Sequence, residues 1–443
     1  MANTVLTRTP SSASNQKTFT MSVWVKRLVQ GAQSAIMCVG NNPSSSMFML
    51  RFDPDTFNIY GHGSNPNITT HRKFYDPTAW YHVVLAVDTT QASASDRVKL
   101  YVNGVQETSF STASYPSQND DLLVNSTTQI HIGERPDDNV HFDGCMSHFH
   151  FIDGTAYPAS TFGETDSSTG EWKIKTSPSV TYGTNGFLIL KDGISVTDQS
   201  GNSNNFTVSQ GSLTKSEDNP SNNFCTLNPM SVDGGSFTIA NGGTAITASA
   251  DNKMLIGTMH SSAGYYEAKL TGSGHGSAGK GVRIGLAKLD GGNAVTYSGI
   301  SGNSGDLERF IGIQNTPGNY VAVYNNGYTV TDYSGNSWSQ NDIVQVAWKN
   351  NKIWYGVNGT WLGSGDPSNG TNEADTLDTT GSFYTPAIIS SLDGATGTQF
   401  NFGNGYFGTT AVSSAGTNAS NIGIFEYDVP TGCTAVSTKG LNE

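Results

Sequence analysis

The 443-residue chain exceeds the length at which a single hydrophobic core usually stops growing, so two domains are expected. Charged residues make up 13% of the chain against about 25% in an average domain, Gly occurs 51 times and aromatic residues reach 10%, which favours strands and turns and excludes a disordered chain. A formal net charge of −13 with only 23 Lys and Arg argues against nucleic acid and anionic lipid surfaces as partners.

Residues 1–14 lack the apolar core of a signal peptide, and apolar runs such as Val83–Val87 are too short to span a bilayer. We therefore expect synthesis in a cytoplasm and no membrane insertion. The four cysteines include no CxxC pair, which excludes a zinc ribbon and favours buried free thiols. A disulfide between Cys225 and Cys433 stays open at this point.

The first half contains short alternating runs separated by polar turns. In residues 97–102, for example, Val98, Leu100 and Val102 share one face, so we expect one face of the strand to pack in a core and the other to be exposed to solvent. Such strands at short spacing predict an antiparallel sandwich. The runs are 19–27, 46–52, 80–88, 97–106, 129–134 and 147–153.

Residues 187–197 then predict a strand pair around an Asp-Gly turn, which would close the first domain. The polar stretch 215–224 carries a Pro and is the most linker-like part of the chain. The second half repeats the strand pattern of the first, and no long amphipathic helix is evident. Its runs are 264–270, 281–289, 309–314, 319–330, 342–362, 384–391 and 398–403.

Asn-Gly occurs in both halves between two runs of strand formers, at Asn103-Gly104 and at Asn358-Gly359. A type I′ turn needs positive φ at both central residues, and Asn-Gly tolerates it, so each pair predicts a β-hairpin.

The first half resembles the laminin-G-like, concanavalin A-type lectin sandwiches. The likeness lies in "TMSVWVKR" (20–27), "WYHVVLAVD" (80–88), "KLYVNGV" (99–105), "IHIGE" (130–134) and "FDGCMSHFHF" (142–151). The second half resembles a SPRY-like sandwich through "GYYEAKL" (264–270), residues 342–362 and the terminal "VPTGCTAVST" (429–438).

The fold class expected from pattern and resemblance is all-β, with two antiparallel jelly-roll β-sandwiches. The first domain is expected over 1–214, a linker over 215–229 and the second domain over 230–443.

A narrower likeness concerns residues 6–27, 151–175, 182–187, 198–208 and 219–229. These stretches together resemble a family of virion proteins of tailed bacteriophages, especially marine ones. The resemblance implies a fibre, spike or decoration on the particle surface, made in the host cytoplasm, assembled with other virion proteins and homo-oligomeric, with a trimer as the first expectation.

Concanavalin-type sandwiches also include retaining glycan hydrolases, whose active strand presents carboxylates at alternating positions. Glu164–Asp166 and Glu426–Asp428 have the spacing of such a pair, but both lack the third carboxylate. We therefore expect no enzyme activity. A glycan-degrading enzyme remains the second alternative, and a purely structural capsid or tail decoration the first.

Two metal hypotheses arise from the first half. His148 and His150 would share a strand face near His131 and His141, although hydrogen-bonding strand histidines are the simpler interpretation. Asn and Asp side chains in predicted loops offer hard oxygen ligands for calcium, the one cofactor expected here, although ordinary solvent-exposed turns use the same residue types. These calcium candidates are Asn119, Asp120, Asp121, Asp137, Asp138 and Asn139.

Sugar binding needs an aromatic face to stack on a pyranose and fixed polar groups around it. The aromatic residues in or beside predicted turns of the second half are the ligand-binding candidates: Tyr328, Tyr333, Trp338 and Trp361. Those inside strands are expected to pack in cores: Trp24, Trp80, Trp348 and Trp354. The favoured hypothesis is a non-catalytic virion surface protein that attaches to a host-surface glycan or another envelope receptor.

Overall fold

The structure, a computed structural model, describes residues 4–42, 46–61, 63, 66–136, 140–231, 236–248, 253–272, 282–290, 310–315, 321–325, 328–377, 382–390 and 397–440. The chain divides into two compact units, Met1–Lys215 and Ser216–Glu443. The helices given with full bounds in those ranges are short 3-10 turns at Ala94–Asp96 (η2), Ala159–Thr161 (η3) and Leu362–Ser364 (η6). None of the helices described is long and apolar enough to cross a membrane.

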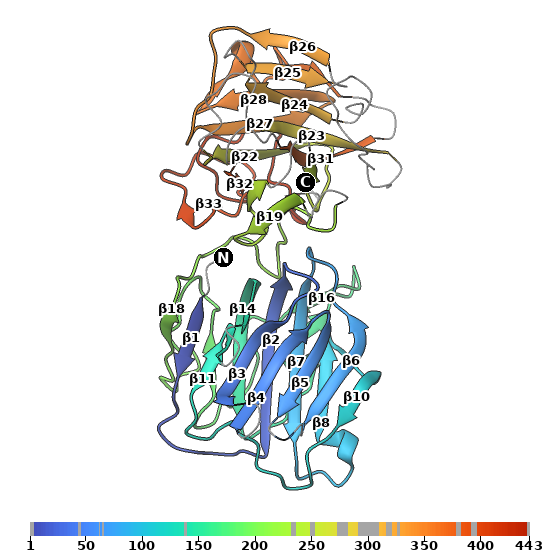
Figure 1. The fold of residues 1–443 in the computed structure, drawn as a ribbon, viewed down its shortest axis with the longest axis vertical. Coiled ribbons are helices and arrows are strands. Elements are labelled where there is room, and N and C mark those ends of the chain that lie inside the picture. Colours follow the sequence, from blue (N-terminus) through green and yellow to red (C-terminus); the bar gives the residue numbers. More distant parts are fainter. Residues whose placement is uncertain are drawn as a thin grey trace. The chain divides into compact units, whose positions relative to one another are not determined.

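The first unit is an antiparallel β-sandwich (Figure 1). Its strands are Val5–Arg8 (β1), Thr18–Arg27 (β2), Ser34–Asn42 (β3), Ser46–Asp53 (β4), Thr56–Gly61 (β5), Asn67–Lys73 (β6), Trp80–Asp88 (β7), Val98–Val102 (β8), Val105–Gln106 (β9), Phe110–Ser114 (β10), Ile130–Ile132 (β11), Gly144–Asp153 (β14), Phe187–Ile189 (β17) and Thr207–Gln210 (β18). One sheet has eight strands in the order β10-β6-β5-β4-β3-β11-β1-β18, and the other has six in the order β17-β14-β2-β7-β8-β9. Two short hairpins join Glu134–Arg135 (β12) to Val140–His141 (β13) and Gly163–Thr165 (β15) to Trp172–Ile174 (β16).

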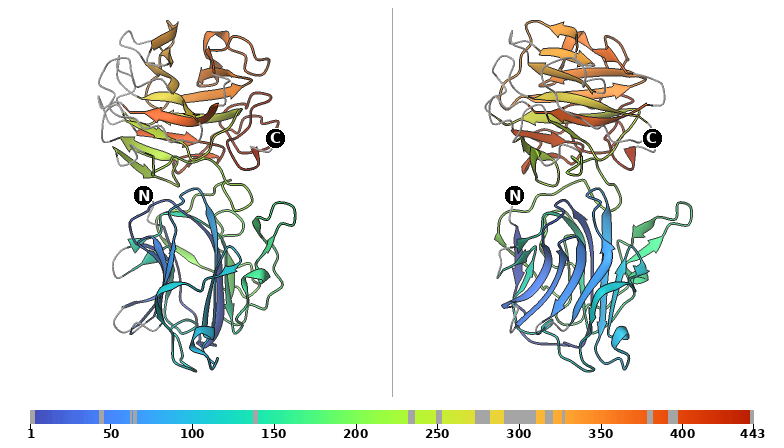
Figure 2. Two further views of the ribbon diagram at one scale, coloured as in Figure 1. Left: turned by 90° about the vertical axis from the view of Figure 1, so that its right-hand side faces the viewer. Right: turned by 45° about the vertical axis from the view of Figure 1, so that its right-hand side comes forward.

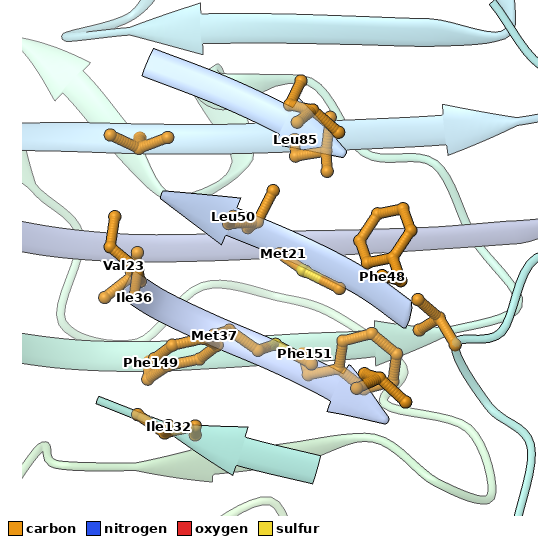
Figure 3. Packing of buried hydrophobic residues seen from close by; sticks show 14 of the residues in the cluster. Met21, Val23, Ile36, Met37, Phe48, Leu50, Leu85, Ile132, Phe149 and Phe151 are labelled. Carbon is orange, nitrogen blue, oxygen red and sulfur yellow. The ribbon is translucent and has the colours of Figure 1, made fainter. Parts of the chain in front are cut away.

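The core of the first unit lies between its two sheets, which face each other in Figure 2. Every second residue of β2 points into it, including Met21 and Val23, and Phe48 and Leu50 of β4 enter from the opposite sheet. Figure 3 shows these side chains interdigitating between the strands. The period of two in the sequence therefore places the same apolar residues in this core.

The outer face of the six-stranded sheet is also buried in part, although alternation predicts a wet face there. Val84 and Ile152 on that face pack with Ala159 and Phe162, and with partly buried side chains up to Tyr182. The polar-looking segment 155–182 therefore covers the sheet, because it carries scattered aromatic residues that bury against the strands.

The second unit is likewise an antiparallel β-sandwich. Its strands are Phe237–Ala240 (β19), Ala245–Ala248 (β20), Met254–Ile256 (β21), Gly264–Leu270 (β22), Arg283–Asp290 (β23), Phe310–Asn315 (β24), Val321–Asn325 (β25), Tyr328–Tyr333 (β26), Ile343–Lys349 (β27), Lys352–Val357 (β28), Thr360–Trp361 (β29), Asp375–Thr376 (β30), Ser382–Ile389 (β31), Gly397–Asn401 (β32), Tyr406–Phe407 (β33) and Thr410–Ala411 (β34). One sheet has the order β19-β20-β32-β22-β27-β28-β29, with β30 beside β28, and the other has the order β21-β31-β23-β24-β25-β26. The two sandwiches establish the all-β fold class.

Two hydrophobic clusters flank the sheet that contains β22 and β27. Tyr266 and Val346 point into the core between the sheets, whereas Tyr265 and Ala347 point to the outer face. There they pack under the C-terminal segment that includes Phe425. Figure 1 shows β22, β27 and β28 following one another in this sheet.

The segment expected as a linker, 215–229, lies with the second unit from Ser216 onward. Cys225 and Leu227 belong to the core of the second unit, and Phe224 forms an isolated antiparallel β-bridge with Ser437 near the C-terminus. Polar composition suggested a linker here, but three apolar residues within the stretch suffice to dock it.

None of the four cysteines, all of which lie in the described ranges, forms a disulfide, and Cys38, Cys225 and Cys433 are buried. Cys225 and Cys433 belong to different clusters, which leaves no disulfide between them.

Candidate functional site

The candidate site is built around the second Asn-Gly turn, between β28 and β29. Asn358 and Gly359 have φ of 48° and 83°, as a type I′ turn requires. The Asn358 Oδ1 accepts a hydrogen bond from the backbone N–H of Ile343 at 2.9 Å, and its Nδ2 donates to Asp342 Oδ1 at 2.7 Å. The turn is thereby tied to the start of β27.

A pocket of about 460 Å³ opens beside this turn. Two walls come from the sheet and the turn, through Gln345 and Trp361, and the others from two stretches of the C-terminal segment, 414–416 and 426–428. A bond from the Gly416 N–H to the Phe425 carbonyl oxygen, 2.9 Å long, holds those two stretches together. The described lining residues are Gln345, Gly359, Trp361, Ser414, Ala415, Gly416, Glu426, Tyr427 and Asp428.

Tyr427 lies directly on Gly359. A Cβ at position 359 would come within 2.9 Å of the Tyr427 ring, so the glycine is needed for this approach as well as for its positive φ. Trp361 is partly buried against the outer cluster, with its ring 6.5 Å from that of Tyr265. Neither the Trp361 indole N–H nor the Tyr427 hydroxyl has a hydrogen-bond partner in the part of the chain that the structure describes.

The polar groups of the pocket are held in place by their own neighbours. Gln345 Oε1 accepts from the Gly359 N–H at 2.8 Å. Glu426 accepts from the backbone N–H and the hydroxyl of Ser413. Asp428 Oδ1 accepts from the N–H and hydroxyl of Thr417 at 2.6 and 2.8 Å. The Thr417 N–H lowers the pKa of Asp428, so this carboxylate is charged at neutral pH.

Glu267 on β22 lies beneath the pocket and is fully buried. Its carboxylate accepts from the backbone N–H groups of Glu426 and Tyr427 at 2.9 and 2.8 Å. The Tyr265 hydroxyl and the Asn401 amide donate to the same carboxylate at 2.9 and 3.2 Å. Burial raises the pKa of Glu267 to about 7, although these four donors act in the opposite direction. Glu267 thus fixes the backbone that presents the pocket's acidic wall.

The four aromatic candidates of the sequence do not meet in one place. Trp361 lines the pocket. Trp338 is 1% exposed and belongs to the hydrophobic core, so its expected ligand contact is wrong. Tyr333 is half-buried against that core and its ring faces Gly363. Tyr328 begins β26, and its side chain lies outside the described residues.

The strand tryptophans expected to pack do so. Their exposed fractions are 4%, 9%, 0% and 1% for Trp24, Trp80, Trp348 and Trp354. Trp338 shares their environment despite its turn position, because the turn folds back over the core.

Of the calcium candidates, Asp137, Asp138 and Asn139 lie outside the described residues. In the other group Asp121 forms an ion pair with Lys17 at 3.6 Å, and the carbonyl oxygen of Asp120 accepts from the Thr89 hydroxyl at 2.8 Å. Asn119, with φ of 62°, is exposed in the same turn. Across the described ranges, no three His, Cys, Asp or Glu side chains are grouped so as to hold a metal ion.

The strand histidines belong to a buried polar array on the outer face of the six-stranded sheet. His150 Nδ1 is 2.8 Å from the Tyr182 hydroxyl. A β-bulge precedes it, and His148 has a φ of 49°, so the two histidines do not follow the regular alternation that the sequence suggests. His131 instead pairs with Glu134 at 3.3 Å.

His82 is the centre of this array. It stacks on Trp24 with ring centroids 4.7 Å apart, its Nε2 is 2.8 Å from Ser22 Oγ, and its Nδ1 accepts from the Trp172 indole N–H at 2.9 Å. Burial lowers the pKa of both His82 and His150 to about 3. These contacts support a neutral, structural array.

Sequence reasoning missed most of the pocket. The sequence presents Glu426–Asp428 only as an incomplete hydrolase motif, and Gln345 and Ser414 carry no local signal. The informative feature was the Asn358-Gly359 turn, because a tight turn that admits no Cβ often marks a close approach by another group.

Residues 2–160 match a laminin G-like family model described as the concanavalin A-like lectin/glucanases superfamily. A search of curated proteins finds no match.

Three solved structures match the chain at low sequence identity. Domains LG4-5 of the mouse laminin alpha1 chain are 9% identical with a TM-score of 0.29, covering 90% of this chain and 84% of that one. The SPRY domain of human HERC1 is 14% identical with a TM-score of 0.27, covering 37% and 91%. A heptameric SAP-like pentraxin from Limulus polyphemus is 12% identical with a TM-score of 0.28, covering 43% and 97%.

Proposed function

We propose that this chain is a non-catalytic glycan-binding protein of a tailed-phage virion surface, and that the pocket beside Gly359 binds the glycan. The observation that carries the proposal is the joint presence of two aromatic residues, Trp361 and Tyr427, and fixed polar groups in one pocket. An aromatic face stacks on the apolar face of a pyranose, while carboxylate, amide and hydroxyl groups bind its hydroxyls. The lectin-type family match of residues 2–160 supports carbohydrate or ligand binding in general.

The virion assignment is supported by the sequence likeness of residues 6–27, 151–175, 182–187, 198–208 and 219–229 to phage particle proteins. Other virion proteins and a homo-oligomer, with a trimer as first expectation, belong to the same proposal. Host attachment follows as the role of a glycan-binding surface protein on a particle.

The absence of catalysis is part of the proposal, and the chemistry of the pocket supports it. A general acid for glycoside hydrolysis needs a raised pKa, whereas hydrogen bonds from Thr417 lower that of Asp428. Both Asp428 and Glu426 are also engaged by their own loop. These are properties of fixed binding groups.

The test is binding of the purified full chain to host cells and a glycan array, with and without a calcium chelator. W361A should weaken binding at least about tenfold, because it removes a stacking face. Phe383 is 49% exposed in the same unit and does not line the pocket, so F383A is the matched control. Binding that W361A leaves unchanged would contradict this site. No binding by correctly folded protein would favour the purely structural decoration, and release of sugar products would favour an enzyme.

A further inference from the structure

The pocket beside Gly359 has an uneven charge. Two of its lining residues, Glu426 and Asp428, are acidic, and its described lining contains no Lys, Arg or His. Asp342 lies just outside, bonded to the side chain of Asn358 in the turn. Burial, followed by the charges of Glu426, Glu267 and Asp342, raises the pKa of Tyr427. Tyr427 therefore lies in a negative field to which Glu426 and Asp342 contribute.

Lys349 at the end of β27 and Lys352 at the start of β28 bind groups outside the pocket. Lys349 Nζ donates to the carbonyl oxygens of Ser368 and Thr431 at 3.0 and 2.5 Å. Lys352 pairs with Glu373 at 3.1 Å. The acidic wall of the pocket is thus not neutralised by these two side chains.

One carboxylate keeps an acceptor for a ligand. Both hydrogen bonds from Thr417 go to Asp428 Oδ1, and Oδ2 accepts none from the described residues. Asp428 is exposed at the pocket edge. A cation placed here would be attracted to the carboxylate and also to the faces of Trp361 and Tyr427.

We infer that this pocket selects a sugar with a free ammonium group, such as a non-acetylated glucosamine unit, over neutral and N-acetylated sugars. The inference rests on the proposed function, because it names the ligand class of the same site. The pyranose stacks on an aromatic face, the ammonium group binds Asp428 Oδ2, and Glu426 adds to the attraction. The indole N–H of Trp361 and the hydroxyl of Tyr427 remain to bind ring hydroxyls.

The experiment is calorimetric titration of the full chain at pH 6 with three probes: the β-1,4-linked tetramers of glucosamine, N-acetylglucosamine and glucose. We expect the glucosamine tetramer to bind about tenfold tighter than the other two, and this advantage to shrink as salt rises. D428N should abolish the preference, since its side-chain oxygen still accepts from Thr417 while the charge is gone. D332N is the control, because Asp332 is exposed on β26 and does not line the pocket.

The outcomes separate the inference from the proposed function. Equal binding of all three tetramers, or preference for a neutral one, would overturn the ammonium inference while W361A could still show that the pocket binds glycans. A preference that D428N and D332N affect equally would also overturn it, since general attraction to a chain of net charge −13 would explain the result. If no glycan on the array binds either, both the inference and the proposed function fail.

Discussion

Glu267 illustrates how one buried residue can position a site that it does not touch. Its carboxylate holds the N–H groups of Glu426 and Tyr427, whose side chains form the acidic and aromatic walls of the pocket. A buried acceptor surrounded by four donors is costly to replace, because any donor left without a partner loses its hydrogen bond.

At the residue scale, E267Q should therefore lower the free energy of unfolding by about 2 kcal/mol and weaken ligand binding, since the new amide N–H₂ faces N–H donors. Urea unfolding and glycan binding measure the two effects. Glu373 forms a partly exposed ion pair with Lys352, so E373Q serves as the control and should cost well under about 1 kcal/mol. Equal costs for the two variants would show that the Glu267 network contributes little.

At the element scale, the two Asn-Gly hairpins use the same construction. In each, the Asn side chain accepts a hydrogen bond from one backbone N–H of a neighbouring strand: Asn103 from His82 of β7 at 2.8 Å and Asn358 from Ile343 of β27 at 2.9 Å. In each, an aromatic ring from a distant segment covers the glycine. Trp172 lies on Gly104 as Tyr427 lies on Gly359. The turns thus act as docking points for the segments that cover the outer faces of the sheets.

This construction predicts that G104A lowers the free energy of unfolding by more than the strain of a positive φ at position 104 alone explains. A Cβ on Gly104 would come within 2.5 Å of the Trp172 ring, whereas a Cβ on Gly31, also at positive φ, meets no atom within 4 Å. G31A should lower the free energy of unfolding by about 1 kcal/mol, because alanine is strained in a left-handed backbone conformation. G104A should lower it by about 2 kcal/mol more, because its Cβ also collides with the Trp172 ring. Urea unfolding compares them, with proteolysis of segment 155–182 as a second readout. Similar costs and unchanged proteolysis would mean that Trp172 does not depend on this glycine.

At the scale of the whole molecule, the two units should respond to pH in opposite directions. In the first unit, burial lowers the pKa of His82 and His150 to about 3 and of His148 to about 4, below the ordinary value of 6.5. Between pH 6.5 and these values the unfolded chain binds more protons, so stability from these groups is lost as pH falls. In the second unit, the pKa of Glu267 is raised from 4.5 to about 7, so its contribution is present below pH 4.5 and lost as pH rises to 7.

Scanning calorimetry of the full chain between pH 7 and pH 5 tests this opposition. As pH falls from 7 to 5, the unfolding temperature of the first unit should decrease. The contribution of Glu267 should raise the unfolding temperature of the second unit over the same range. G104A and E267Q assign the transitions, because each should shift one of them. E267Q should also remove the upward movement. Parallel movement of both transitions, unchanged by E267Q, would contradict the pH assignments.

The local sequence pattern predicts many of the strands and turns of this protein. Alternation in residues 19–27, 80–88 and 97–102 predicts the strands and the residues that enter the first core, and Asn-Gly predicts both hairpins. It failed for Trp338, since a position next to a turn does not reveal whether the turn folds back over the core. It also failed for the outer faces, where period-two alternation cannot show which distant segment will cover a strand.

The sequence by itself determined the all-β class, the repeated hairpins and Trp361 as a candidate, because these follow from the two-residue period of strands and the backbone freedom of Asn-Gly. Only the tertiary structure decided that Glu426, Tyr427 and Asp428 join Trp361 and Gln345 in one pocket above Glu267. The physical reason is that long-range contacts place residues about 160 positions apart side by side, as for Glu267 and Tyr427, and no local pattern encodes that meeting.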